Sequence, residues 1–129
     1  MDISLQTNSG DRRLEFRDVR KSGKEDYSCL LVLESRGFSA NRSFYFDDYQ
    51  LVRFLEDLVV MQRDVKGEAL LRHSFEEDRI LFKVSTLGHV VVSGFLVEQS
   101  DSRQELHFCF ETDQTVLGPL LENFRALRP

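Results

Sequence analysis

Three histidines, His73, His89 and His107, are the first residues to test for metal binding or acid–base chemistry. A zinc site needs its ligands to converge on one ion. In the strand pairing derived below, His107 faces Phe95, which lies six residues beyond His89. At about 3.3 Å per residue, His89 and His107 are then roughly 20 Å apart and cannot share a metal. We therefore expect no metal and no cofactor.

The two cysteines, Cys29 and Cys109, lie far apart in the sequence and have no adjacent histidine to activate a thiolate. Both fall in apolar, strand-like segments, so we expect two packed, reduced thiols rather than a disulfide framework or a zinc site. The sequence contains no G-x-S-x-G elbow and no glycine-rich phosphate loop. These observations predict a protein that is not an enzyme.

Carboxylates gather in three places, at residues 47–48, 56–57 and 76–78. The first group has a structural explanation, because an aspartate followed three residues later by glutamine is a capping-box pattern at the start of a helix. Glu56 and Asp57 point away from the apolar stripe of that helix. Glu76, Glu77 and Asp78 fill a predicted turn between strands. We expect the second and third groups to be exposed.

The overall composition is that of one folded domain spanning residues 1–129. Charged residues make up 30% and hydrophobic residues 41% of the chain, and the net charge is −5. This acidity argues against nucleic-acid binding, which needs a basic face. Residues 1–10 lack the apolar core of a signal peptide, and no apolar stretch approaches the ~18 residues that cross a membrane. We expect a cytoplasmic protein.

The elements that must position these residues follow from apolar periodicity. Strands are expected near residues 3–5 and 14–16, joined through Asn8-Ser9-Gly10, and then at 27–34, 38–46 and, more weakly, 69–75. A helix begins at Asp47 and ends before Gly67. A second helix starts at about Pro119, because proline suits the first turn. The apolar stripes of the two helices comprise Leu51, Phe54, Leu55, Leu58 and Met61, and Leu117, Leu120, Leu121, Phe124 and Leu127.

Residues 79–112 predict three consecutive antiparallel strands whose register is set by glycine. A three-residue loop ending at Gly88, which tolerates the left-handed conformation, places Val84 opposite Val90 and Ile80 opposite Gly94. A longer loop centred on Asp101 then places Gly94 opposite Phe108. The missing side chain at Gly94 leaves room for its two large neighbours. A slip of one residue would turn every apolar side chain of a strand to the wrong face.

The opposite face of this meander is mixed. Its apolar members are Leu81, Val91, Phe95, Val97 and Cys109, and its polar members are Lys83, Ser93, Glu105, His107 and Glu111. We expect a second internal layer to cover this face, and a partner surface is the alternative. The predicted fold class is α+β: a sandwich-like or strongly curved antiparallel sheet of about seven or eight strands, with one mid-chain and one C-terminal helix.

Two segments carry a resemblance to known proteins: GFSANRSFYFDDYQLVRFLEDL (residues 37–58) and HSFEEDRILFKVSTLGHVVVSGFL (residues 73–96). Their layout resembles a family of bacterial proteins similar to WapI-type immunity proteins of contact-dependent toxin systems. The resemblance implies a non-enzymatic protein that binds one protein partner, a toxin domain. This chain departs from the family pattern because it contains no tryptophan.

Three hypotheses about function follow. The first is an immunity-type module that binds a basic toxin domain through Glu56, Asp57, Glu76, Glu77 and Asp78, since opposite charge speeds association. The second is a small-ligand-binding protein or modest enzyme with an apolar pocket between sheet and helices, lined by some of the eleven phenylalanines. The third is a weak homodimer formed through the mixed face of the meander.

Overall fold

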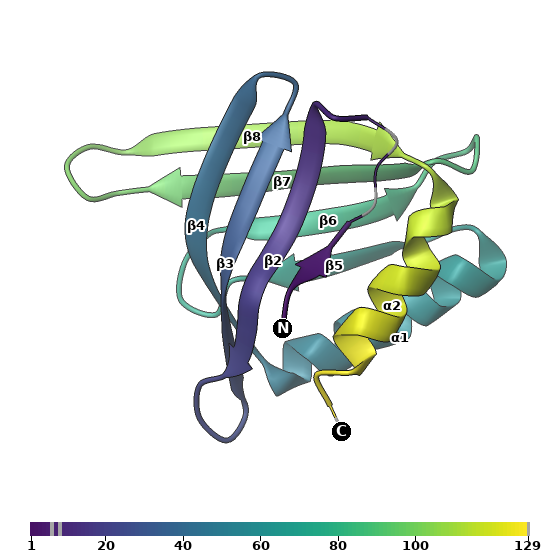
Figure 1. Cartoon of the computed structure of the whole chain (residues 1–129), viewed down its shortest axis with the longest axis horizontal. Coiled ribbons are helices and arrows are strands. Elements are labelled where there is room, and N and C mark those ends of the chain that lie inside the picture. Colours follow the sequence, from purple (N-terminus) through teal and green to yellow (C-terminus); the bar gives the residue numbers. More distant parts are fainter. Residues whose placement is uncertain (6, 8, 129) are drawn as a thin grey trace.

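The computed structural model describes residues 1–5, 7 and 9–128 (Figure 1). Of the predicted connection Asn8-Ser9-Gly10, Asn8 therefore falls outside the described residues. Along the chain the elements are β1 (Ile3–Ser4), β2 (Arg12–Lys21), β3 (Asp26–Ser35), β4 (Phe38–Asp47), α1 (Asp48–Asp64), β5 (Glu68–Arg72), β6 (Arg79–Val84), β7 (Val90–Glu98), β8 (Gln104–Thr112), the 3₁₀ turn η1 (Gln114–Val116) and α2 (Leu117–Arg125). Within the described residues, the predicted α+β class with eight strands and two α-helices is confirmed.

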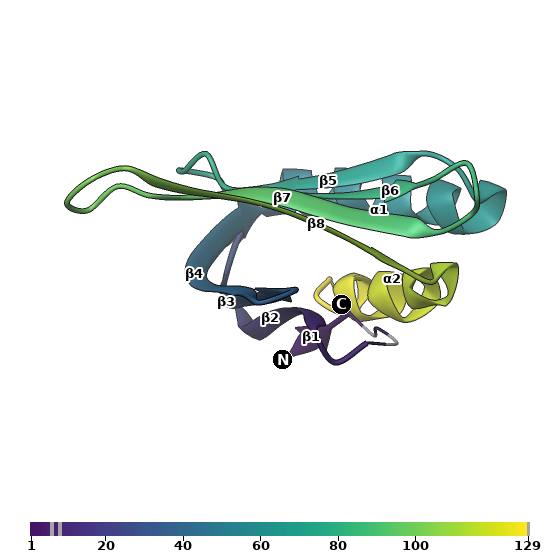
Figure 2. The ribbon, with the colours of Figure 1, turned by 90° about the horizontal axis from the view of Figure 1, so that it is seen from above.

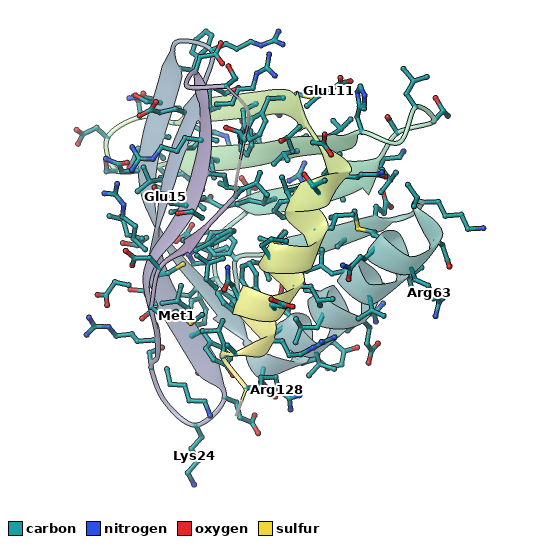
Figure 3. All side chains as sticks on the ribbon, turned by 45° about the vertical axis from the view of Figure 1, so that its right-hand side comes forward. Met1, Glu15, Lys24, Arg63, Glu111 and Arg128 are labelled. Atoms are coloured by element: carbon teal, nitrogen blue, oxygen red, sulfur yellow. The ribbon has the colours of Figure 1, made fainter. Side chains whose placement is uncertain are left out.

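The strands form two antiparallel sheets of four, β1-β2-β3-β4 (sheet A) and β5-β6-β7-β8 (sheet B). Figure 2 shows sheet B as one layer, with sheet A and α2 side by side beneath it and α1 alongside β5. The side chain of Lys24 extends into solvent from the turn between β2 and β3 (Figure 3). Apolar residues of both sheets and both helices meet in one core.

Phenylalanine rings join the layers. The ring of Phe124 in α2 lies 5.1 Å from that of Phe16 in β2 and 5.1 Å from that of Phe54 in α1. Phe54 in turn lies 5.7 Å from Phe82 in β6. These edge-on and tilted arrangements suit the quadrupoles of aromatic rings. These rings are completely buried and pack against one another between the two sheets and the two helices.

The predicted start of α1 is confirmed, but only half of the capping box forms. The Asp47 carboxylate accepts a hydrogen bond from the backbone N–H of Gln50 at 2.8 Å. The Gln50 side chain does not return to the cap; its Oε1 accepts from the backbone N–H of Arg72 at 3.1 Å. This bond ties the first turn of α1 to the end of β5, and so fixes where the following loop begins.

The C-terminal helix begins earlier than predicted. Asp113 caps η1 by accepting from the N–H of Thr115 at 2.9 Å, and α2 continues directly from Leu117. Pro119 is thus the third residue of α2, where a backbone N–H would still have no partner within the helix. The predicted apolar stripe is confirmed, with Leu117, Leu120, Leu121 and Phe124 buried.

The predicted register of the meander is confirmed. Val84 pairs with Val90, Ile80 with Gly94, and Gly94 with Phe108. Gly88 closes the first hairpin with φ of 82°, in the left-handed region that favours glycine. The period-two pattern and one turn glycine are therefore enough to define three strands of sheet B.

The expectation that a second layer covers the mixed face of the meander is wrong. Sheet A and α2 cover the other face, and on the mixed face Lys83, Glu105, His107, Cys109 and Glu111 are exposed. Phe95 is nevertheless buried, because neighbouring side chains lie over it. The Arg79 guanidinium lies 4.8 Å from the Phe95 ring centroid and the His107 ring 4.5 Å from it. Long polar side chains here replace a second layer.

Candidate functional site

The loop between β5 and β6, residues 73–78, lies across the free edge of β4. The N–H of Ser74 donates to the carbonyl of Tyr45 at 2.7 Å, and the N–H of His73 donates to the carbonyl of Asp78 at 2.9 Å. The first bond attaches the loop to sheet A, and the second closes the loop on itself. The loop thus bridges the two sheets and shields part of an edge strand, which would otherwise offer unpaired backbone groups.

Asp78 is not part of an exposed acidic cluster, and this prediction is wrong. Asp78 is only 1% exposed. Its Oδ1 accepts from the N–H of Val97 at 3.2 Å, and its Oδ2 accepts from Nε of Arg42 at 3.2 Å. Arg79, the first residue of β6, pairs with Phe95 of β7, so Val97 lies beyond the end of β6 and has no partner in that strand. The carboxylate therefore takes the place of a missing strand partner at that point of the sheet.

Arg42 completes this network from the other sheet. It pairs with Leu31 on the inward face of β4, among apolar neighbours. Its guanidinium donates to the Val97 carbonyl and, at 2.8 Å, to Glu98. A buried charge is tolerated only when paired and hydrogen-bonded. Arg42 and Asp78 satisfy each other and two backbone groups of Val97, and this fixes sheet A to sheet B near the loop.

His73 orders the other end of the loop. Its Nδ1 accepts from the backbone N–H groups of Phe75 at 3.0 Å and Glu76 at 3.1 Å. The imidazole is buried, with its ring 5.3 Å from Phe44. Burial lowers its pKa below the ordinary value of 6.5, against the opposing attraction of the carboxylates of Asp78 and Glu76. The lone pair of Nδ1 is occupied by the loop, so His73 acts here as a structural acceptor.

The lowered pKa of His73 predicts a pH-dependent stability. In the unfolded chain His73 takes up a proton as the pH falls through about 6.5, whereas the folded protein resists protonation until a lower pH. Stability is therefore highest above pH 6.5 and falls below it, by at most about 1.4 kcal/mol per pH unit. Urea unfolding at about pH 7.5 and about pH 5.5 measures this loss. His73→Asn, whose Oδ1 can accept the same bonds, should reduce the loss; an equal loss in both proteins contradicts the prediction.

The ordered loop holds an apolar ring in solvent. Phe75 is 77% exposed, and its ring centroid lies 6.2 Å from that of Tyr45 on the outward face of β4. Leu30 of β3 lies on the same face and is also exposed. These residues and Glu76 border a surface hollow of about 410 Å³. We call Leu30, Tyr45, Phe75 and Glu76 the Phe75 patch.

Two acidic residues of the β5–β6 loop lie where the sequence predicts them. Glu76 and Glu77 are exposed as predicted, and Glu77 binds Arg103 at 2.7 Å. Glu56 and Asp57 are exposed on α1, about 12 Å along the helix from its start, and no hydrogen bond or ion pair between described residues joins them to the loop. The structure therefore does not unite the two acidic groups in one cluster.

The apolar members of the patch were missed. The predicted weak strand of residues 69–75 ends at Arg72 in the structure, so Phe75 lies in the loop and outside the strand pattern. An apolar residue directly before three carboxylates was the available signal. Leu30 and Tyr45 could have been found as the apolar side chains on the outward faces of two paired strands.

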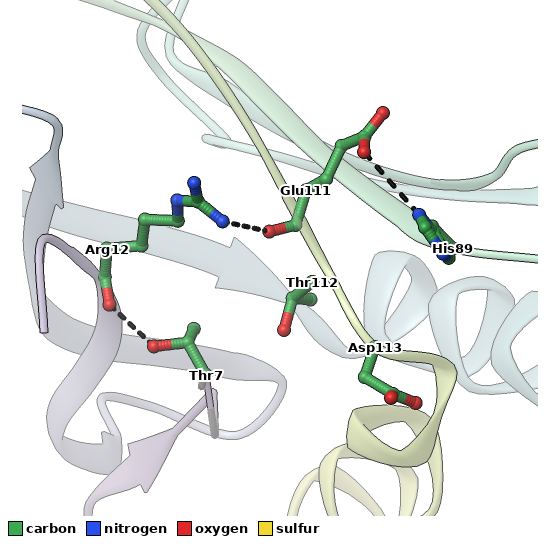
Figure 4. A pocket seen from close by; sticks show the side chains of 6 residues that line it. All are labelled: Thr7, Arg12, His89, Glu111, Thr112 and Asp113. Carbon is green, nitrogen blue, oxygen red and sulfur yellow. Dashed lines mark hydrogen bonds and ion pairs between the residues drawn. The ribbon is translucent and has the colours of Figure 1, made fainter. Parts of the chain in front are cut away.

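A second hollow, of about 250 Å³, lies where β2 approaches the end of β8 (Figure 4). Arg12 reaches across it and donates from Nη1 to the carbonyl of Glu111 at 3.2 Å. His89 and Glu111 lie 3.5 Å apart on its far side. The lining mixes an arginine, a histidine, carboxylates and threonine hydroxyls. The Arg12 bond gives the hollow a structural role in holding sheet A to sheet B.

The two cysteines differ, which corrects the expectation that both are packed. Cys29 is buried, and burial raises its pKa to about 12. Cys109 is exposed on β8. Because the thiolate is the reactive form, iodoacetamide at neutral pH should alkylate Cys109 alone in the folded protein and both thiols after denaturation. Mass spectrometry counts the adducts, and a Cys109→Ser variant that is still alkylated when folded would contradict this prediction.

Within residues 1–5, 7 and 9–128, no group of three or more His, Cys, Asp or Glu side chains is placed to hold a metal ion. None of the described helices is both long enough and apolar enough to cross a bilayer. Comparison with known protein families, with curated proteins and with solved structures found no match to the chain. The fold and the site define an α+β two-sheet domain that presents an exposed aromatic residue on a braced loop.

Proposed function

We propose that this chain is a non-enzymatic protein-binding domain that binds one protein partner through the Phe75 patch. One observation carries the proposal: Phe75 is exposed, while His73 and Asp78 on either side of it are buried and hydrogen-bonded. The buried network around Asp78 joins sheet A to sheet B, and the bonds of His73 and Asp78 also fix the two ends of this loop. Here the network holds one conformation, and a preorganised aromatic side chain is the usual anchor of a binding hot spot.

The patch favours a partner with an apolar pocket bordered by lysine or arginine. The ring of Phe75 would enter the pocket, and the cation would approach Glu76. The net charge of −5 and the exposed Glu77, Glu56 and Asp57 attract a basic partner over a longer range. Together with the resemblance of residues 37–58 and 73–96 to the WapI-type layout, this supports a bacterial, cytoplasmic immunity protein that neutralises a basic toxin domain by covering it.

The test is binding to the basic C-terminal domain of a toxin encoded next to this protein, measured by isothermal titration calorimetry. Phe75→Ser should weaken binding by about 2 kcal/mol, roughly 30-fold, because it removes the anchor and leaves the fold intact. Leu87→Ser is the matched control, since Leu87 is equally exposed but lies in the β6–β7 turn. No measurable complex, or equal losses in the two variants, would refute the proposal.

A further inference from the structure

A second phenylalanine is exposed for a different reason. Phe38 is the first residue of β4 and pairs with the buried Ser35, so its side chain lies on the inward face of sheet A. It is nevertheless 66% exposed. Further along the same face, Phe44 and Phe46 are completely buried against the core. Phe38 differs because β8 is the last strand of sheet B, and β4 continues past it (Figure 1).

The edge of β8 beneath Phe38 has free backbone groups. In an antiparallel ladder, alternate residues turn their N–H and C=O groups away from the paired strand. The carbonyl of Glu111 points outward in this way, since it accepts from Arg12. By alternation, the N–H and C=O groups of Glu105, His107 and Cys109 also point away from β7, toward the free edge of the sheet. Among the described residues, no hydrogen bond from outside the strand reaches those of His107 or Cys109.

There is room beside this edge for one more strand. Two hollows flank Phe38, of about 200 Å³ toward Arg36 and Cys109, and of about 370 Å³ toward Ala40 and Leu96. β8 spans nine residues and contains no proline or bulge, so its edge is long and regular. A strand paired to β8 would turn alternate side chains inward, beneath Phe38 and into these hollows.

The solvent-facing side of β8 carries two carboxylates. Glu105 and Glu111 are exposed there, with His107 and Cys109 between them. Arg103 binds Glu105 at 2.7 Å and His89 lies 3.5 Å from Glu111, so a basic strand would compete with these two neighbours. Opposite charges on neighbouring strands stabilise a pair, and like charges destabilise it. A strand beside β8 is therefore favoured when its outward residues are lysine or arginine and its inward residues are apolar.

We propose that the edge of β8 is a second binding site, which takes an extended segment of a protein partner with basic and apolar residues in alternation. The segment adds a fifth strand to sheet B and buries Phe38. Main-chain hydrogen bonds supply the affinity, and the hollows beside Phe38 select the inward side chains. The site lies at the first residue of β4, whereas the Phe75 patch lies near its last, so each site can be tested without the other.

The probe is a capped synthetic peptide in which lysine and valine alternate. Titrated into the full chain labelled with ¹⁵N, it should shift the amide resonances of His107 and Cys109 and slow their hydrogen exchange. The resonances of Phe75 and Glu76 should not move. A peptide with glutamate in place of lysine should bind at least about tenfold more weakly, since it places like charges opposite Glu105 and Glu111.

A matched pair of variants tests the backbone bonds. Cys109→Pro removes an outward N–H at an edge position, where proline is tolerated, and Cys109→Thr keeps it. The proline variant should bind the lysine–valine peptide about tenfold more weakly than the threonine variant. If Cys109→Pro does not fold, Phe38→Ser serves instead, because the Phe38 side chain is already mostly exposed.

Three results would overturn the proposal: equal affinity of the proline and threonine variants, peptide-induced shifts confined to other residues, and tight binding of the glutamate peptide. A fourth is a dimer of the chain alone in sedimentation equilibrium, with the amides of His107 and Cys109 already protected. That result would assign the edge to a second copy of the chain.

Discussion

Asp78→Ala is expected to lower the free energy of unfolding by about 3 kcal/mol, because it leaves a buried ion pair with only one partner. The Asp78 side chain has no solvent exposure, and Arg42 is mostly buried. Without the carboxylate, the Arg42 guanidinium and the N–H of Val97 both lose an acceptor in a place that water reaches poorly. Urea unfolding followed by circular dichroism measures the loss.

The neighbouring carboxylate supplies the control. Glu77 is also acidic and also bound to an arginine, but its side chain and that of Arg103 are both about half exposed. Glu77→Ala should therefore change stability by less than about 1 kcal/mol. A loss of similar size in Asp78→Ala and Glu77→Ala would show that burial of the Asp78 pair has no special effect.

A double-mutant cycle separates the pair from its surroundings. Arg42→Met keeps an apolar stem between the sheets and removes the charge. If Asp78 and Arg42 act as one unit, the variant that carries both Asp78→Ala and Arg42→Met should be more stable than the sum of the single losses predicts. Additive losses would mean that each residue stabilises the fold through other partners.

Gly94→Ala is expected to destabilise the protein by about 2–3 kcal/mol, because the new methyl group has no space. A Cβ at residue 94 would lie 2.4 Å from Cε1 of Phe108 and 2.7 Å from the carbonyl oxygen of Arg79. The ring can rotate or shift, but the carbonyl belongs to the paired strand β6 and is held by the ladder. The same urea unfolding experiment gives the change.

Two further variants locate the cause. Gly10→Ala is the matched control, since a Cβ at Gly10 would meet nothing within 4 Å, and it should be close to neutral. Phe108→Leu in the Gly94→Ala background should recover part of the lost stability by removing the ring contact, while the contact with Arg79 remains. The entropy change of a Gly→Ala substitution in the unfolded chain is common to both variants and is stabilising. If Gly10→Ala and Gly94→Ala nevertheless have similar effects on stability, the close approach at residue 94 has no measurable cost and the prediction is contradicted.

The strands and the first helix could be predicted from the sequence because their signals are local. Period-two alternation defines a strand with one buried face, and helical spacing of apolar residues defines α1. The register of the meander followed from Gly88 and Gly94. Gly88 tolerates the left-handed turn conformation, and Gly94 leaves space for a large side chain on the neighbouring strand. The start of α2 was harder to predict because the 3₁₀ turn η1 precedes it. Pro119 suggested a start at that residue, although Asp113 caps the preceding turn.

The candidate site was only partly predictable. Glu76 and Glu77 are exposed, as a run of carboxylates in a turn suggests. Asp78 belongs to the same run in the sequence, yet it is buried because Arg42, 36 residues earlier, reaches it from the other sheet. No local pattern distinguishes the three carboxylates. Phe75 and Phe38 also look like ordinary core residues of a strand until the ends of β5 and the width of sheet B are known.

By itself the sequence determined the approximate positions of the strands and the two helices, which face of each strand is apolar, and how the last three strands pair. These properties depend on side-chain period and on backbone freedom within a few residues. Only the tertiary structure decided which apolar faces are covered, which carboxylate is buried and which phenylalanines remain in solvent. Those outcomes depend on where sheet A crosses sheet B, and this crossing is fixed by contacts between residues far apart in the chain.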